Sequence, residues 1–95
     1  MAIKDVTLEN VKDFCGISDD ASDALLTGFQ AAAYNLVKSY TGLSDYEINS
    51  YDDLTTAYLV LINDMYNNRD YTTANAKINP LVATILSLHS GNLVG

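Results

Sequence analysis

Residues 53–70 read DLTTAYLVLINDMYNNRD, and this stretch decides the fold that the sequence predicts. Its apolar residues recur every three or four positions, which is the spacing of one face of an α-helix. These residues are Leu54, Ala57, Tyr58, Leu61, Met65 and Tyr66. Leu59, Val60 and Ile62 lie off that stripe. A helix that is apolar on several faces must be covered by its own domain or by neighbouring chains, so the stretch raises the question of assembly.

Length, composition and charge limit the classes of protein to which the chain can belong. Its 95 residues are 48% hydrophobic, which favours one globular domain over residues 1–95. The 12 acidic and 5 basic residues give a net charge of −7, the opposite of a surface that grips a nucleic-acid backbone. No uncharged apolar run approaches the roughly 20 residues that span a bilayer, and the N-terminus lacks a signal-peptide pattern. We therefore expect a soluble protein that is not secreted, contacts no membrane and does not bind DNA tightly.

A short helix is predicted over residues 8–15. Thr7 is a good N-cap for it, and Gly16 supplies its stop. Val6 and Val11 stand where a hydrophobic staple would close over its first turn. Its inner face is expected to consist of Leu8, Val11, Phe14 and Cys15.

The longest predicted helix begins near the cap cluster at residues 18–20 and ends before Gly42. At 1.5 Å per residue its ~22 residues would span roughly 33 Å, which is long for so small a domain. Its inner face is expected to consist of Ala21, Leu25, Phe29, Ala32, Leu36, Val37 and Tyr40.

Two more helices are predicted in the second half of the chain. Ser50 and Asp53 offer a capping box for the helix of the opening stretch, which closes near Asn68 or Arg69. A last helix begins at residues 79–80, where an asparagine cap precedes a proline at the first helical position, and stops at Gly91. Its apolar face is expected to consist of Leu81, Val82, Ile85, Leu86 and Leu88.

The connections over residues 43–50 and 70–78 are polar and longer than the usual connection within a helical bundle. The predicted fold class is therefore all-α: a bundle of about four helices, one short, two long and one short C-terminal, with two longish polar loops. Loops of this length are candidate contact surfaces.

Four residues in or beside these loops are candidates for a subunit or partner interface. Tyr46, Tyr51 and Tyr71 qualify because tyrosine is common at interface hot spots. Arg69, the only arginine, either satisfies the carbonyls at the end of its helix or forms an ion pair across a subunit boundary. The tyrosines within the helices are expected at the core or its edge; they are Tyr34, Tyr40, Tyr58 and Tyr66.

The sequence offers little for catalysis, and we expect no enzymatic activity, no cofactor and no metal. His89 is the only histidine and has no partner evident in the sequence, and Cys15, the only cysteine, fits a small core position. One acidic cluster invites comparison with a hard-cation site, but it lacks the spacing of a calcium loop and favours stabilisation of a helix dipole instead. The cluster consists of Asp19, Asp20 and Asp23.

Several segments, in this order, resemble the head-tail connector (adaptor) proteins of tailed bacteriophages. They are TLENVKDF, DDASDALL, AAAYNLVKSYTG, MYNNRD and INPLVATIL, and together they cover nearly the whole chain. The most specific elements are the helix end at Tyr40-Thr41-Gly42 and the closure of the third helix at Met65-Tyr66-Asn67-Asn68-Arg69.

This resemblance implies a structural subunit of the phage neck, assembled in the cytoplasm of the bacterial host. About a dozen copies would form a ring below the portal protein, extend the DNA channel and receive a tail-completion or stopper protein. DNA would pass without specific binding, which agrees with the acidic charge. The family docks on the portal through its C-terminal region, and only HSGNLVG follows the last predicted helix here.

Two other functions fit the residues taken alone. A small acidic helical domain can act as an interaction module that binds a protein partner through its third helix. It can also mimic a nucleic acid and occupy the cleft of a basic protein with its carboxylates. Neither alternative involves enzymatic activity.

Overall fold

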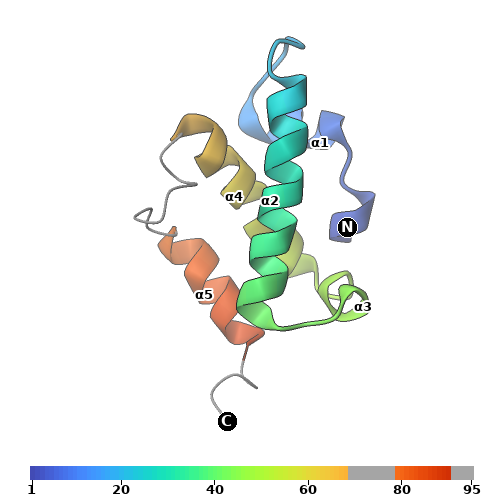
Figure 1. Ribbon diagram of the computed structural model, residues 1–95, viewed down its shortest axis with the longest axis vertical. Helices are drawn as coiled ribbons and strands as arrows, with labels where there is room; N and C mark the ends of the chain where they lie inside the picture. Colours follow the sequence, from blue (N-terminus) through green and yellow to red (C-terminus); the bar gives the residue numbers. More distant parts are fainter. Residues whose placement is uncertain (69–78, 91–95) are drawn as a thin grey trace.

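The central element of the fold is α4 (Asp52–Asn67), in a computed structural model that describes residues 1–68 and 79–90. α4 packs against η1 (Ile3–Asp5), α1 (Leu8–Cys15), α2 (Asp23–Thr41) and α5 (Pro80–Leu88). In Figure 1, α2 runs the length of the molecule in front of α4, and α5 lies beside α2. The described residues contain helices and no strands, which confirms the all-α prediction.

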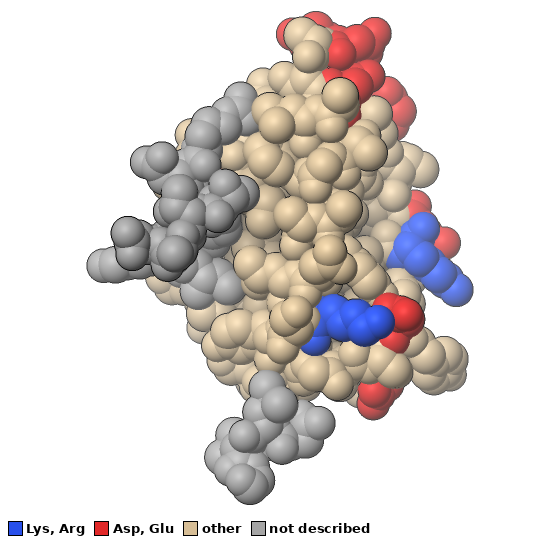
Figure 2. Space-filling model, in the orientation of Figure 1, with Lys and Arg blue, Asp and Glu red and all other residues tan. Residues whose placement is uncertain are grey.

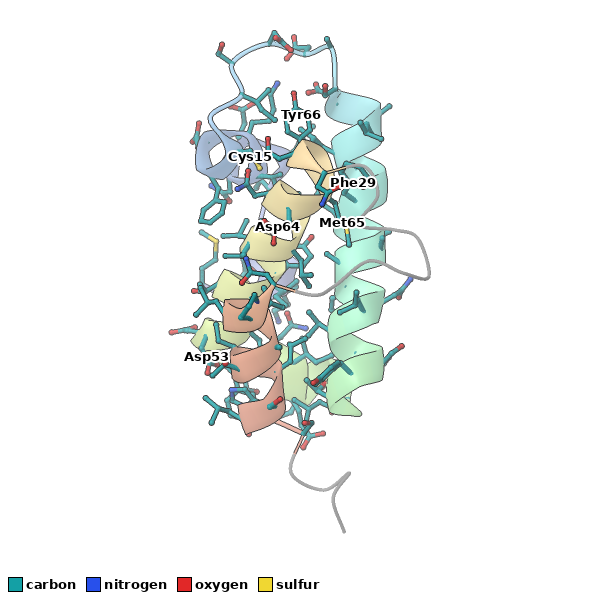
Figure 3. The ribbon with its side chains drawn as sticks, turned by 90° about the vertical axis from the view of Figure 1, so that its left-hand side faces the viewer. Cys15, Phe29, Asp53, Asp64, Met65 and Tyr66 are labelled. Atoms are coloured by element: carbon teal, nitrogen blue, oxygen red, sulfur yellow. The ribbon has the colours of Figure 1, made fainter. Side chains whose placement is uncertain are left out.

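The predicted stripe of α4 lies in the core. Leu54, Ala57, Tyr58, Leu61 and Met65 are buried, and Tyr66 is half-buried against them. Ile62 is buried as well, and Leu59 and Val60 pack against the core from its edge. Figure 3 shows Met65 of α4 and Phe29 of α2 between the two helices. The sequence leaves open whether the domain itself or a neighbouring chain covers α4, and the structure shows that the domain itself covers Ile62.

α1 forms where the sequence predicts it. The Thr7 hydroxyl accepts a hydrogen bond from the Asn10 amide while the Asn10 side chain accepts one from the Thr7 amide, which completes a capping box. Gly16 ends the helix in the left-handed conformation at φ 73°, which favours glycine. Val11 is buried, but Phe14 is exposed, so the predicted inner face of this helix is one residue too wide.

α2 begins later than predicted and buries a different face. Its first residue is Asp23, after the cap residue Ser22, and Gly42 at φ 71° ends it as expected. The residues that it buries completely are Leu26, Ala33, Val37 and Thr41. Phe29 and Leu36 are half-buried, whereas Ala21 lies before the helix and Leu25, Ala32 and Tyr40 are exposed. The prediction therefore holds for Val37, Phe29 and Leu36 and is wrong for the other four residues, because leucine and alanine occur on both sides of this helix and spacing alone does not fix its orientation.

One helical turn interrupts the connection predicted over residues 43–50. α3 (Asp45–Ile48) starts with a capping box between Ser44 and Glu47, and its Ile48 is buried. The capping box predicted at the start of α4 is absent. The cap residue there is Tyr51, without a side-chain cap, and the Ser50 hydroxyl donates to the Tyr46 carbonyl at 2.8 Å.

α5 begins as predicted, with the Asn79 side chain accepting a hydrogen bond from the Leu81 amide at 2.8 Å and Pro80 at the first helical position. Its last residue is Leu88, and the predicted stop at Gly91 lies outside the described residues. The buried residues are Val82 and Leu86, while Leu81 and Leu88 are exposed, so the predicted apolar face is too wide. Within the described chain, no helix has the length and apolar character needed to span a membrane.

Candidate interaction surfaces

The most exposed of the predicted interface residues is Tyr46, which lies on α3. Its side chain is 83% exposed and borders an open hollow of about 310 Å³. The other residues around the hollow are Lys4, Asp45, Asn49 and Ser50. The Asn49 side chain accepts a hydrogen bond from the Lys4 amide at 2.8 Å, which fastens η1 to α3. We call this surface the α3 corner.

The α3 corner is joined to α2 through Asp45. Lys38 of α2 donates to the Asp45 carboxylate at 3.0 Å, and the Tyr34 hydroxyl donates to the same oxygen. The hydrogen bond from Tyr34, followed by that from Lys38, lowers the pKa of Asp45. Burial, followed by the hydrogen bond to Asp45, raises the pKa of Tyr34 to about 12. Asp45 is therefore held as an anion, and the one-turn helix stays docked on α2.

Tyr51 lies next to a histidine and an aspartate that join α5 to the start of α4. The His89 ring lies 4.3 Å from the Tyr51 ring, centroid to centroid, and its Nε2 lies 2.8 Å from Asp53 Oδ2. Asp53, labelled in Figure 3, stands at the first turn of α4. His89 is the C-cap residue of α5. No partner for His89 is evident from the sequence, and the fold places Asp53 beside it. Tyr51 thus has an intramolecular packing role beside any role at an interface.

The other two predicted interface residues, Arg69 and Tyr71, lie outside the described residues. Tyr46 lies in α3, and Tyr51 is the N-cap residue of α4, so the two residues stand on either side of the turn between these helices. Of the four predicted interface residues, the structure therefore describes two, Tyr46 and Tyr51.

Two aspartates of the acidic cluster around the start of α2 contact a buried lysine. Lys12 of α1 contacts Asp20 Oδ1 at 2.7 Å and Asp23 Oδ1 at 3.0 Å, and its side chain is only 5% exposed. The hydrogen bonds that Lys12 donates to Asp20 and then to Asp23 raise the pKa of Lys12, and the same bond from Lys12 lowers the pKa of Asp20. Asp19 and Asp20 precede the helix, so the predicted dipole role fails for both.

The structure favours neither a reactive cysteine nor a metal site among the described residues. Cys15 is half-buried against the core, and this burial raises the pKa of its thiol and keeps it protonated. The part of the chain that is described holds no group of three or more metal-ligating side chains placed to bind an ion.

A third surface consists of the outward sides of α2 and α5, and we call it the neutral face. No charged residue occurs in residues 24–37 of α2 or anywhere in α5. In Figure 2 this surface is uncharged between acidic side chains beyond one end of α2 and further charged side chains toward the other. The two helices meet where the Tyr40 hydroxyl lies 3.4 Å from the Ser87 hydroxyl. The exposed large apolar residues on it are Leu25, Tyr40, Leu81 and Leu88.

These features define a small acidic all-helical protein that exposes several large aromatic and apolar side chains. The model of the phage gp6-like head-tail connector protein family matches residues 5–86, and the chain belongs to this family. The match runs from η1 to the end of the buried part of α5. Comparisons with curated proteins and with solved structures find no match. The chain is thus a structural protein of the phage neck that interacts with other virion components.

Proposed function

We propose that this protein is the subunit of a ring that joins the portal vertex of a phage capsid to the tail. The observation that carries the proposal is the connector family match over residues 5–86. The all-helical fold with one shared core supports it, because such a domain can be repeated around an axis as a rigid unit. We take residues 1–95 as a single connector domain, present in about a dozen copies.

The ring would extend the DNA channel and receive a tail-completion or stopper protein. With a net charge of −7 per chain, about a dozen copies would carry on the order of 80 negative charges, which repel the DNA backbone. Lys12 is buried and ion-paired, so it adds no positive charge to a channel wall. DNA would then pass without specific binding. A solved ring with Lys4, Lys38 or Lys77 lining the channel and the acids outside would contradict this part.

We assign Tyr46, Tyr51, Arg69 and Tyr71 to the contacts between subunits or with the portal. The support is strongest for Tyr46, because its ring projects from a corner that several hydrogen bonds hold in place. A rigidly mounted and exposed aromatic ring is typical of an interface anchor.

The test mixes the purified full-length chain with purified portal protein and measures the mass of the products by light scattering. We expect a ring-sized complex. Tyr46→Ala should weaken binding by about tenfold or more, and Tyr46→Phe, which keeps the ring, should bind nearly as wild type. Arg69→Ala should also weaken assembly while leaving the monomer folded.

The proposal as a whole is wrong if the wild-type chain neither forms oligomers nor binds portal. Equal binding by wild type and Tyr46→Ala would remove only the assignment of Tyr46.

A further inference from the structure

The outward surface of α2 has a composition that its own fold does not explain. The face opposite the buried Leu26, Ala33 and Val37 consists of small or uncharged residues, and all of them are exposed. Within residues 24–37 they are Ala24, Leu25, Gly28, Ala31, Ala32 and Asn35. A solvent-facing side of a helix usually carries charged residues, and this side carries none between residues 24 and 37; the exposed Lys38, which pairs with Asp45, borders it.

Gly28 stands near the centre of this outward side. Glycine inside a helix lowers helix stability relative to alanine, and it is needed where φ is positive or another group comes close. Gly28 is not among the positive-φ glycines, and a Cβ added there would meet nothing within 4 Å. The fold of one chain therefore gives no reason for glycine at this position. A second backbone packed against α2 would supply one.

We propose that the neutral face is a contact surface for a second copy of this chain. The inference rests on the proposed ring and adds the surface through which neighbouring subunits meet. The exposed apolar residues extend the surface from α2 onto α5, where Leu81 is 53% and Leu88 72% exposed. Because α2 and α5 meet at Tyr40 and Ser87, these side chains can be covered by one neighbour.

Charge favours a second copy as the occupant. Two identical chains of net charge −7 repel each other, so their contact must avoid setting carboxylates against carboxylates. The neutral face meets that condition, because its charged flanks lie beyond the ends of the uncharged stretch (Figure 2). DNA is not a suitable occupant, since residues 24–37 of α2 and all of α5 offer no cation to phosphates, and Lys38 at the border is already paired with Asp45.

In a closed ring the neutral face of one subunit packs on a different surface of the next, because head-to-tail contacts generate rings. Small residues at the centre allow the neighbouring chain to approach closely, and the larger apolar residues at the margins exclude water. The neutral face is one half of such a contact.

The experiment measures self-association of the full-length chain by sedimentation velocity at rising concentration. Ala32→Glu and Ala32→Lys place a charge of either sign on the neutral face, and each should weaken association by about tenfold or more. Thr56→Glu is the matched control: Thr56 is exposed on α4, and the variant has the same net charge as Ala32→Glu. It should change association by about twofold or less. Far-ultraviolet circular dichroism confirms that all three variants are folded.

Three results overturn the inference: a wild-type chain that stays monomeric, Ala32 variants that associate like wild type, or a control that loses as much as they do. Portal binding, measured in parallel, separates this failure from failure of the proposed function. If the Ala32 variants associate normally and wild type binds portal, the surface is wrong and the connector assignment stands. If wild type neither associates nor binds portal, both fail.

Discussion

α4 and α2 are both long and rich in apolar residues, yet α4 is enclosed by other elements and α2 is covered on one side only. α4 lies among η1, α1, α2 and α5, and even its off-stripe residue Ile62 is buried. α2 is covered along one side, and its Leu25 and Ala32 face outward. The apolar content of a helix shows how much of its surface favours burial, but the elements packed around it decide whether that surface is buried within one chain. Exposed large apolar residues therefore occur on α2 and α5, whereas α4, which the sequence singles out, has none.

The first test of this difference shortens one apolar side chain on each helix and compares the loss of stability. Ile62→Ala should destabilise the monomer by about 2–5 kcal/mol, because it leaves a cavity between α4 and the elements around it. Leu25→Ala removes as many side-chain carbon atoms from the outward side of α2 and should cost less than about 1 kcal/mol. Urea denaturation followed by circular dichroism measures both. A similar loss in the two variants would mean that α2 is as enclosed as α4.

The fold was largely predictable because its helix ends carry strong local preferences. Thr7, Gly16, Gly42 and Asn79 act in the structure as the sequence suggests, since caps depend on a few neighbouring residues. The one-turn α3 was missed although Ser44 and Glu47 have capping-box spacing, because four residues give no apolar period to recognise.

The surfaces were less predictable because they depend on residues far apart in the sequence. Lys12 meets Asp20 and Asp23 only when α1 folds back beside α2, and His89 meets Asp53 only when α5 docks on α4. The buried face of α2 could not be predicted from the sequence either, since apolar residues occur on two sides of this helix. Tyr46 was predicted in a loop and lies instead on the one-turn α3, where its side chain is exposed; its interface role stays a prediction.

The second way to test the comparison is pH, because the ion pairs with resolved shifts hold the two ends of α2. The pKa values of Asp20 and Asp45 are lowered from 3.8, so their stabilisation is present above that pH and is lost as acid protonates them. The pKa of Lys12 is raised from 10.5 and that of Tyr34 from 10.0, so their stabilisation is present below those values and is lost as the pH rises. Thermal unfolding should show a plateau of melting temperature between these limits and a fall on both sides.

The Lys12→Met variant checks the source of the alkaline fall. It leaves Asp20 and Asp23 without their cation, so its melting temperature at neutral pH should drop, and the fall above pH 10.5 should become shallower. Hydrogen exchange should report earlier opening of α2 than of α4 at either extreme. If α4 opened first, the ion pairs would not be what distinguishes the two helices.

The smallest expected effect comes from adding a single Cβ atom at Gly28. This change separates the stability of the monomer from self-association. Gly28→Ala should raise the stability of the monomer by about 0.5–1 kcal/mol, since alanine is the better helix former and its Cβ meets nothing within 4 Å. If a neighbouring chain packs closely on α2, the same Cβ should weaken self-association although the monomer is more stable. Urea denaturation of the dilute monomer and sedimentation of the concentrated protein measure the two effects. A gain in stability with unchanged association would leave Gly28 without a role in the contact and confine close packing to other parts of the neutral face.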